Sequence, residues 1–252
     1  RSITRFSIDC NDGVTAVSRY LAEETARDLG TRRPIRVIPN FVNTARFRRR
    51  PDRRLRARFA EGGETLLAHV SNFRKAKRAP DVIHIFARVN ARHPSRLLMV
   101  GNGPDYAICQ ELVKELALEG RVHFLDFVDE VERFLSISDL GIFPSELEAF
   151  GLAALEALSC QVPVITSDAG GFVELIPEGE VGYLRPVGDI EGMAERALML
   201  LRDEALRRGM GASARRLVLE SYRSEEVISL YEAFYREILG GRREEAATEA
   251  AT

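Results

Sequence analysis

Short apolar runs alternate along this chain with longer stretches in which apolar positions recur at helical spacing. The short runs predict strands at Val14–Val17, Arg36–Ile38, Leu66–Val70, Leu97–Val100, Val122–Leu125, Leu140–Phe143, Val162–Thr166 and Tyr183–Leu184. The stretches between them predict helices at Ser18–Leu29, Pro80–Ala91, Pro104–Leu118, Val131–Ile137, Leu152–Ser159, Ile190–Leu201 and Asp203–Leu219. Strands that alternate with helices of this length indicate βαβ units, so we expect an α/β fold with a Rossmann-like parallel sheet and helices on both faces.

One break in composition divides the chain, an arginine-rich segment from Asn43 to about Gly63. A strand–helix–strand unit, residues 1–42, precedes this break. A continuous series of βα units follows it, and we place the Rossmann-like domain at residues 43–222.

A last helix is expected within residues 223–240. Ser224 is a suitable N-cap, and Glu225 and Glu226 suit the first helical turn. The helix would carry apolar side chains that need a surface to pack on, namely Val227, Ile228, Leu230, Tyr231, Phe234, Tyr235 and Ile238. Residues 241–252 are charged and rich in alanine, and we expect them to be disordered.

The overall charge gives no reason to expect a polyanionic partner. The chain has 36 basic and 38 acidic residues and a net charge of -2, so no global field attracts nucleic acid or an anionic membrane. A local cluster comprises Arg46, Arg48, Arg49, Arg50, Arg53, Arg54, Arg56 and Arg58. Because no aromatic residues alternate with these arginines, we interpret the cluster as a solvated linker or helix face rather than a nucleic-acid patch.

The cysteines and the hydropathy of the chain indicate the cellular compartment in which the protein is expected. Cys10, Cys109 and Cys160 are odd in number and far apart, which predicts neither a disulfide framework nor a metal site and suits a reducing cytoplasm. No apolar run approaches the roughly 20 residues of a membrane span, and no signal peptide precedes the first strand. Because the chain begins with Arg1 inside an established fold pattern, we expect it to be a fragment.

The candidate chemistry lies in a loop that follows the strand Leu140–Phe143. Open α/β sheets bind ligands at the carboxyl ends of their strands. Gly151 allows the backbone to approach a ligand closely, and the start of the next helix offers unpaired N–H groups. Glu148 and Glu156, eight positions apart, could accept hydrogen bonds from hydroxyls at two ends of an extended polar ligand. The alternative interpretation is that both glutamates are solvated and have no ligand. The sequence Phe150-Gly151-Leu152 between them makes this alternative the weaker one.

The spacing of these two glutamates resembles the E-x7-E signature of family 4 glycosyltransferases, which have the two-domain GT-B fold. Further matching motifs occur in the family's order, namely Val37-Ile38-Pro39-Asn40-Phe41-Val42, Gly101-Asn102-Gly103-Pro104-Asp105, Val162-Pro163-Val164-Ile165 and Ala169-Gly170-Gly171-Phe172-Val173-Glu174. The resemblance implies a retaining glycosyltransferase whose donor-binding, C-terminal domain is residues 43–222. It also implies that residues 1–42 are a remnant of the N-terminal, acceptor-side domain and its crossing. The last helix would then cross back onto that domain.

A finer resemblance concerns the substrates. It is carried by Asp12-Gly13-Val14-Thr15-Ala16-Val17-Ser18, by His69-Val70-Ser71-Asn72-Phe73-Arg74 and by the residues from Ser145 to Glu156. These are similar to family members that transfer N-acetylglucosamine from UDP-GlcNAc to L-malate in bacillithiol biosynthesis. Family members that act on inositol phosphate, lipopolysaccharide or sucrose-type acceptors stay open, as does a non-catalytic nucleotide-binding module. A homo-oligomer is also left open.

The resemblance assigns roles residue by residue. The donor sugar would be held by Glu148 with the N–H groups of Ala149, Phe150, Gly151 and Leu152, and the ribose hydroxyls by Glu156. The diphosphate would contact Arg74 and Lys77, with Arg78 as the alternative second cation.

Four further residues are placed in the donor site on the same grounds: Ser71, Asn72, Gly103 and Phe127, the last either as a stacking partner of uracil or as a core residue. His69 is interpreted as a core histidine. The resemblance implies no metal ion and no enzyme nucleophile. With most of the acceptor domain missing, we expect this chain to bind UDP-sugar weakly and not to transfer sugar.

Overall fold

The structure is a computed structural model that describes residues 2–249. Six strands form one parallel sheet in the order β5-β4-β3-β6-β7-β8, and two more form a separate parallel pair, β1-β2. The strands are β1 Val14–Ala16, β2 Ile35–Val37, β3 Thr65–Val70, β4 Ser95–Val100, β5 Val122–Leu125, β6 Leu140–Phe143, β7 Val164–Ser167 and β8 Gly182–Arg185. Each strand expected from the sequence is therefore present, which confirms the α/β class and the parallel sheet.

The helices follow the expected positions, with four short additions. They are α1 Ser2–Asp9, α2 Arg19–Leu29, α3 Arg53–Ala57, α4 Ala79–Asn90, α5 Tyr106–Glu115, α6 Val131–Ile137, α7 Leu152–Ser159, α8 Phe172–Leu175, α9 Ile190–Arg202, α10 Glu204–Ser221 and α11 Ser224–Glu249. A 3-10 turn, η1, spans Lys75–Lys77. The sequence pattern did not predict α1, α3, α8 or η1, and α3, α8 and η1 are too short to display a helical repeat.

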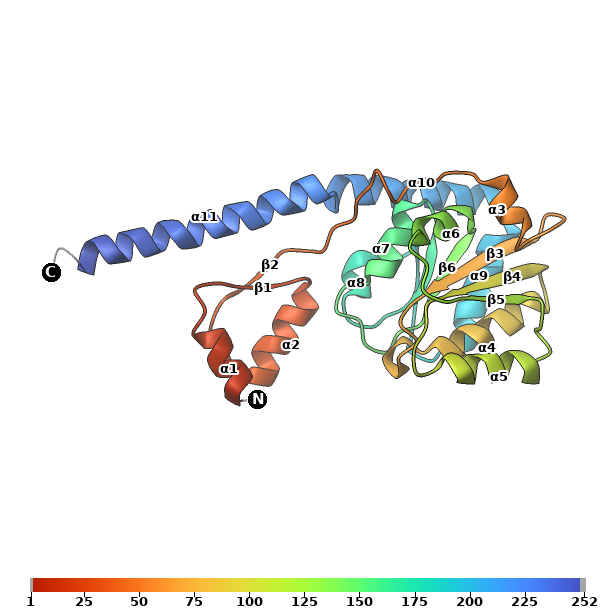
Figure 1. Ribbon diagram of the computed structural model, residues 1–252, viewed down its shortest axis with the longest axis horizontal. Coiled ribbons are helices and arrows are strands. Elements are labelled where there is room, and N and C mark those ends of the chain that lie inside the picture. Colours follow the sequence, from red (N-terminus) through yellow and green to blue (C-terminus); the bar gives the residue numbers. More distant parts are fainter. Residues whose placement is uncertain (1, 250–252) are drawn as a thin grey trace.

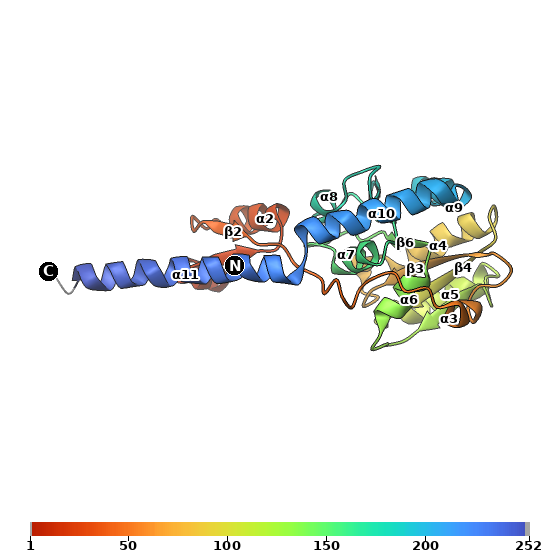
Figure 2. The ribbon, with the colours of Figure 1, turned by 90° about the horizontal axis from the view of Figure 1, so that it is seen from above.

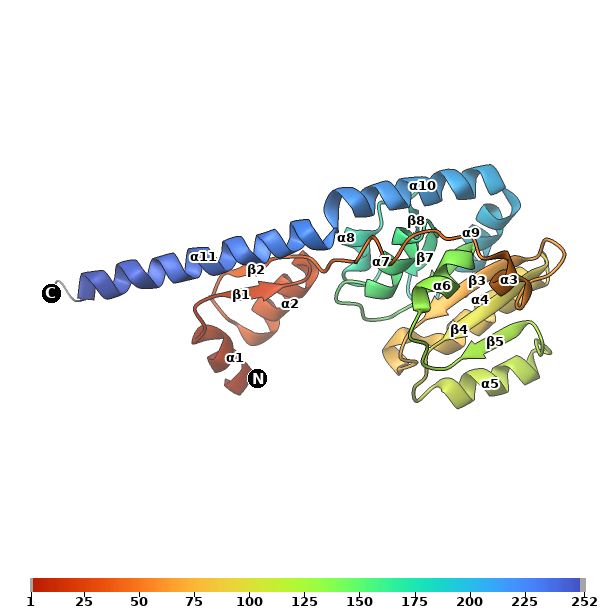
Figure 3. The same cartoon turned by 45° about the horizontal axis from the view of Figure 1, so that its top comes forward.

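The central sheet is buried on both faces, as its apolar strands require. Leu66 and Ala68 of β3 belong to the core under α6, α7 and α10, whereas Leu67 belongs to the core under α4, α5 and α9. Figure 3 shows these two helical layers on opposite sides of the strands. Alternate residues of one strand thus fill two different cores, and its two polar residues, Thr65 and His69, are buried as well.

The order of the strands creates a switch point at the centre of the sheet. From β3 the chain winds outward through β4 to β5, and it returns to begin β6 on the other side of β3. The pairing of Leu67 with Leu140 sets the register of these two central strands. Where successive connections run in opposite directions, a crevice opens at the carboxyl ends of the central strands.

Residues 2–42 and helix α11 lie together beside this domain. Figures 1 and 2 show α11 extending away from the sheet along the β1-β2 pair. Val227 and Phe234 of α11 form a small buried cluster with Ile38, and Arg36 makes an ion pair with Glu237 at 2.9 Å. The apolar face of the last helix therefore packs on the strand–helix–strand unit.

The last helix is longer than the sequence pattern suggested. It continues to Glu249. The expectation of disorder is therefore wrong for residues 241–249, and residues 250–252 lie outside the described part. This segment is rich in alanine, glutamate and arginine, which have high helix propensity, and a helix that is already nucleated extends through such residues.

The arginine-rich segment also differs from expectation. Arg49 donates to the carbonyl of Ser138 at 2.7 Å, and Arg56 binds the carboxylate of Asp139 at 2.7 Å. The segment is thus attached to the edge of the domain through several arginines and is not a solvated linker. Among the described residues, no helix is both long and apolar enough to cross a membrane.

Candidate donor-binding site

A cavity of about 360 Å³ opens at the switch point, where β3 and β6 end. Its lining comprises Asn40, His69, Val70, Ser71, Asn72, Lys77, Phe143, Ser145, Glu148, Ala149, Phe150, Gly151, Leu152, Ala153, Ala154 and Phe172. Eight of the predicted site residues are in this set: Ser71, Asn72, Lys77, Glu148, Ala149, Phe150, Gly151 and Leu152. The cavity thus combines the ends of two parallel strands with the loop that leads into α7.

Lys77 and Glu148 face each other inside the cavity. The Nζ atom of Lys77 donates to Oε2 of Glu148 at 2.6 Å, and the two side chains are only 27% and 14% exposed. Each charge therefore compensates the other in a partly desolvated place, which lowers the cost of holding either one there. A ligand that carries both a phosphate and hydroxyl groups could engage the lysine and the carboxylate at once.

The loop before α7 exposes backbone rather than side chains to the cavity. Gly151 has φ 103°, which favours glycine, and a Cβ atom there would lie 2.6 Å from the ring of Phe172. The bare glycine therefore lets the chain turn sharply and start α7 directly at the cavity wall. The first N–H groups of a helix have no partner within it and can donate to ligand oxygens.

His69 is a buried residue of the cavity wall, and its ring forms a hydrogen bond with Ser71. Its Nδ1 pairs with the carbonyl of Ile142 at 2.8 Å and its Nε2 with Oγ of Ser71 at 2.8 Å. Burial is the main cause that lowers the pKa of His69 from 6.5 to about 4, so the ring is neutral near pH 7. The interpretation as a core histidine is consistent with this geometry, and its added role is to orient the hydroxyl of Ser71.

Glu156 lies on α7 but outside the set of residues that line this cavity. Burial is the largest cause that raises its pKa from 4.5 to about 7, while the charge of Arg46 lowers it and that of Glu132 raises it. Arg46 itself makes an ion pair with Glu132 at 3.0 Å. The structure therefore brings Glu148 to Lys77 but places Glu156 on the flank of α7 that faces the Arg46–Glu132 pair.

The three cations proposed for the diphosphate have different surroundings. Arg74 is exposed at the start of η1, where its side chain makes no hydrogen bond or ion pair within the described residues. Arg78 is engaged by Asp81 at 2.6 Å and by Glu146 at 3.4 Å, outside the cavity. Lys77 alone of the three lines the cavity, which supports it over Arg78 as the second cation.

The two remaining predicted site residues, Gly103 and Phe127, do not line the cavity. A Cβ atom on Gly103 would lie 1.9 Å from the carbonyl oxygen of Asn72, so this glycine packs directly on the loop after β3. Phe127 is 84% exposed. The alternative that Phe127 is a core residue is therefore wrong, and stacking on a ligand stays a prediction.

The structure adds a contact that the sequence did not reveal, between the amino end of α2 and the cavity loops. Ser18 donates from Oγ to the carbonyl of Ala149 at 2.6 Å. The carboxylate of Glu174 accepts the backbone N–H groups of Arg19 at 3.0 Å and Tyr20 at 2.8 Å. Because these partners are more than 130 residues apart, no local pattern signals them.

Asn40 also lines the cavity, although the sequence analysis gave it no site role. Asn40 follows Pro39 in the segment that connects the two parts of the chain. The family motif Val37–Val42 marked this segment in the sequence, but it did not indicate that Asn40 faces a cavity. Within the described residues, no group of three or more histidine, cysteine, aspartate or glutamate side chains could hold a metal ion.

Comparison with known proteins identifies the family. The family model for glycosyl transferases group 1 matches residues 52–217. An N-acetyl-alpha-D-glucosaminyl L-malate synthase of Bacillus anthracis is 41% identical over 94% of this chain. The chain spans 63% of that protein's length.

Solved structures give the same fold. The sucrose-phosphate synthase of Thermosynechococcus elongatus superposes with a TM-score of 0.86 at 25% identity, covering 95% of this chain and 61% of its own. An Anabaena protein crystallised with UDP-glucose gives a TM-score of 0.83 at 22% identity, covering 95% and 67%. The six-stranded sheet and its helices therefore have the architecture of the C-terminal domain of GT-B glycosyltransferases.

Proposed function

We propose that this chain, which belongs to the glycosyl transferases of group 1, binds the donor of a retaining sugar transfer. The donor is UDP-N-acetylglucosamine and the acceptor is L-malate. The observation that carries this proposal is the cavity at the switch point, where Lys77, Glu148 and the backbone of 149–152 converge. The relative that is 41% identical bears the name of this activity, which supports the choice of both substrates.

The chemistry follows from the charges of the cavity. Lys77, together with Arg74 at the rim, would hold the diphosphate and stabilise the charge that develops on it as it leaves. Glu148 would accept hydrogen bonds from sugar hydroxyls, which an ionised carboxylate does without needing a proton of its own. The bond between the anomeric carbon and the phosphate oxygen breaks while the acceptor oxygen bonds to the same face. The acceptor proton passes to the departing phosphate, so no enzyme nucleophile is needed.

Calorimetric titration with UDP and with UDP-GlcNAc tests the donor site. We expect Glu148→Gln to weaken UDP-GlcNAc binding by about tenfold, because a hydrogen bond to a charged group contributes about 1.5–3 kcal/mol. Binding of UDP, which lacks the sugar, should change little, since Glu148 is assigned to the sugar. Glu146→Gln, on the same loop but 40% exposed and paired with Arg78, is the matched control. No binding of UDP by the parent chain, or a Glu148→Gln variant that weakens both ligands equally or leaves UDP-GlcNAc binding unchanged, would contradict the proposal.

The acceptor needs its own experiment. Incubation with UDP-GlcNAc and either L-malate or inositol phosphate, followed by product analysis, separates malate transfer from the inositol-phosphate alternative. We expect this chain alone to bind donor without turnover, because its described residues before the sheet domain, 2–42, supply only the β1-β2 pair and two helices on the acceptor side. Robust transfer by the 252-residue chain would refute that expectation. A cytoplasmic location stays a prediction from cysteine usage.

A further inference from the structure

A second hollow opens at the opposite end of the central sheet. It has a volume of about 690 Å³ and lies where β3, β6 and β7 begin. Its lining comprises Arg49, Pro51, Asp52, Arg53, Arg56, Gly63, Thr65, Ser136, Ile137, Asp139, Gln161, Pro163, Glu204, Arg207 and Arg208. The six residues of β3, at about 3.3 Å each, separate it from the donor cavity by roughly 20 Å.

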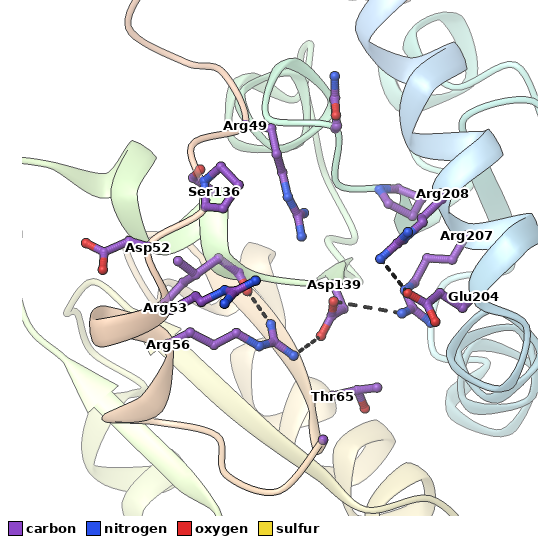
Figure 4. A pocket seen from close by; sticks show the side chains of 15 residues that line it. Arg49, Asp52, Arg53, Arg56, Thr65, Ser136, Asp139, Glu204, Arg207 and Arg208 are labelled. Atoms are coloured by element: carbon purple, nitrogen blue, oxygen red, sulfur yellow. Dashed lines mark hydrogen bonds and ion pairs between the residues drawn. The ribbon is translucent and has the colours of Figure 1, made fainter.

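Arginine dominates this hollow. Figure 4 shows Arg49 and Arg56 reaching toward Asp139 from one wall, with Arg207 and Arg208 on α10 at the other. Five arginines stand against three carboxylates, those of Asp52, Asp139 and Glu204, so the lining carries a formal charge of +2. Most of the contributing arginines come from the arginine-rich segment, which the donor site does not use.

The carboxylates are already committed. Asp139 receives Arg56 at 2.7 Å, lies 3.9 Å from Arg207 and also accepts the backbone N–H of Leu66 at 2.9 Å. Asp52 caps the start of α3 by accepting the N–H of Leu55. Glu204 is paired with Arg208 at 2.6 Å. The acids of the lining therefore engage Arg56, Arg207 and Arg208, which leaves two arginines without a counter-charge among the described residues.

Two arginines in particular have no carboxylate bound to them within the described residues. Arg49 is partly buried, and its described hydrogen bond goes to the neutral carbonyl of Ser138 at 2.7 Å. Burial lowers the pKa of Arg49, and the charges of Arg56 and Arg207 lower it further against the opposing charge of Asp139. Arg53 is exposed at the rim and has no described partner. Unused N–H donors and uncompensated positive charge thus meet in one concave place.

We propose that this hollow, the basal arginine pocket, binds a small phosphorylated molecule or another multivalent oxyanion, at a site separate from the donor cavity. Guanidinium groups match such oxyanions because their planar N–H donors bind two oxygens at once. The proposal requires no movement of the backbone, since Arg49, Arg53 and Arg208 already line the space. Gln161 adds a neutral side-chain amide to the lining.

Titration of the 252-residue chain with inorganic pyrophosphate at low ionic strength tests this site. We expect saturable binding that weakens as sodium chloride is added, because salt screens exposed charges. Arg53→Gln should weaken binding by about tenfold, since it removes charge-assisted hydrogen bonds to the ligand. Arg49→Gln should weaken it at least as much, and circular dichroism checks that this variant folds.

Two control variants make the outcome specific. Arg54→Gln removes the adjacent charge on α3, which does not line the pocket, and should bind pyrophosphate like the parent chain. Lys77→Gln removes the cation of the donor cavity and so reports any pyrophosphate that binds there. Loss of binding in Lys77→Gln with none in Arg53→Gln would place pyrophosphate in the donor cavity and overturn the proposal. Absence of binding to the parent chain, or an equal loss in Arg54→Gln, would overturn it too.

Discussion

The raised pKa of Glu156 makes a pH-dependent prediction about its proposed contact with ribose. Burial is the main cause of the shift, and it holds the pKa at about 7, where the unfolded chain would have 4.5. If the ribose hydroxyls donate to this carboxylate, the ionised form is the one that binds. Lowering the pH from 8 to 6 should therefore protonate Glu156 in most molecules and so remove the form of the protein that binds ribose.

The magnitude follows from the same value. With a pKa of about 7, roughly ten elevenths of the molecules carry the ionised form at pH 8 and roughly one eleventh at pH 6. The affinity for a ribose ligand should thus fall by about tenfold across this range, which is about 1.4 kcal/mol. Binding should also release about half a proton at pH 7, because the complex favours the ionised carboxylate.

Calorimetry with uridine measures both effects. Uridine is preferable to UDP because a terminal phosphate titrates near pH 6 and would add its own pH dependence. Titrations at pH 7 in two buffers with different ionisation enthalpies give the number of protons released. Glu156→Gln should show weaker binding that does not vary with pH. An unchanged affinity of the parent chain between pH 6 and 8, or the same pH dependence in Glu156→Gln, would refute the ribose assignment.

A second measurement, without ligand, tests the pKa itself. An acid whose pKa is raised on folding contributes stability below its unfolded value, and that contribution is lost as the pH rises through about 7. The shift from 4.5 to about 7 corresponds to about 3 kcal/mol. Glu156→Gln, which cannot ionise, should therefore exceed the parent in unfolding free energy by up to about 3 kcal/mol at pH 8. The difference should shrink toward pH 4.5, as followed by urea denaturation.

Three further predictions concern the loops around the donor cavity. Lys77→Gln should weaken UDP binding by about tenfold in calorimetry, whereas the engaged Arg78→Gln should not. Gly151→Ala should lower the unfolding free energy by about 1–3 kcal/mol, more than Gly179→Ala, because both have positive φ but only the former meets a side chain, that of Phe172. Glu174→Gln should cost about 1 kcal/mol by weakening the cap of α2, while Arg19→Gln, which removes only an ion pair whose arginine is 75% exposed, should cost less than about 0.5 kcal/mol. If the two variants of a pair lost the same amount of UDP affinity, or of unfolding free energy, the role assigned to the corresponding contact would be refuted.

The central sheet could be predicted from the sequence because its strands are buried on both faces. A strand such as Leu97–Val100 has no polar position, so it stands out from the amphipathic helices around it. The site could be predicted in part for a related reason. The carboxyl ends of parallel strands share one edge, so the residues that follow β3 and β6, among them Lys77 and Glu148, had to meet.

The position of Glu156 could not be predicted in the same way. Eight helical residues rotate about 80° beyond two full turns, which already moves the second glutamate off the line of the first. Helix α7 begins only at Leu152, moreover, after the left-handed turn at Gly151. The spacing between Glu148 and Glu156 is therefore not helical over its first half, and the flank on which Glu156 lies depends on that turn.

The exposure of Phe127 and the engagement of Arg78 depend on tertiary contacts rather than on pattern. Arg78 is held by Glu146, 68 residues away in the chain, and this contact removes it from the cavity that Lys77 lines. The arginine-rich segment shows the same limit. Its composition indicates solvation, but the carbonyl groups at the end of α6 that accept its N–H donors become available only once α6 has formed.

The contacts of α2 suggest why the donor site spans two parts of the chain. Gly170 packs so closely on the carbonyl of Glu148 that a Cβ atom would lie 2.0 Å from it, and the ring of Tyr20 would lie 3.0 Å away on the other side. Ser18 holds the carbonyl of Ala149 through its hydroxyl. The backbone that carries Glu148 is thus fixed between the Gly170 turn and the amino end of α2. The loop that carries Glu148 therefore packs against both parts of the chain, the sheet domain through Gly170 and the amino end of α2 through Ser18.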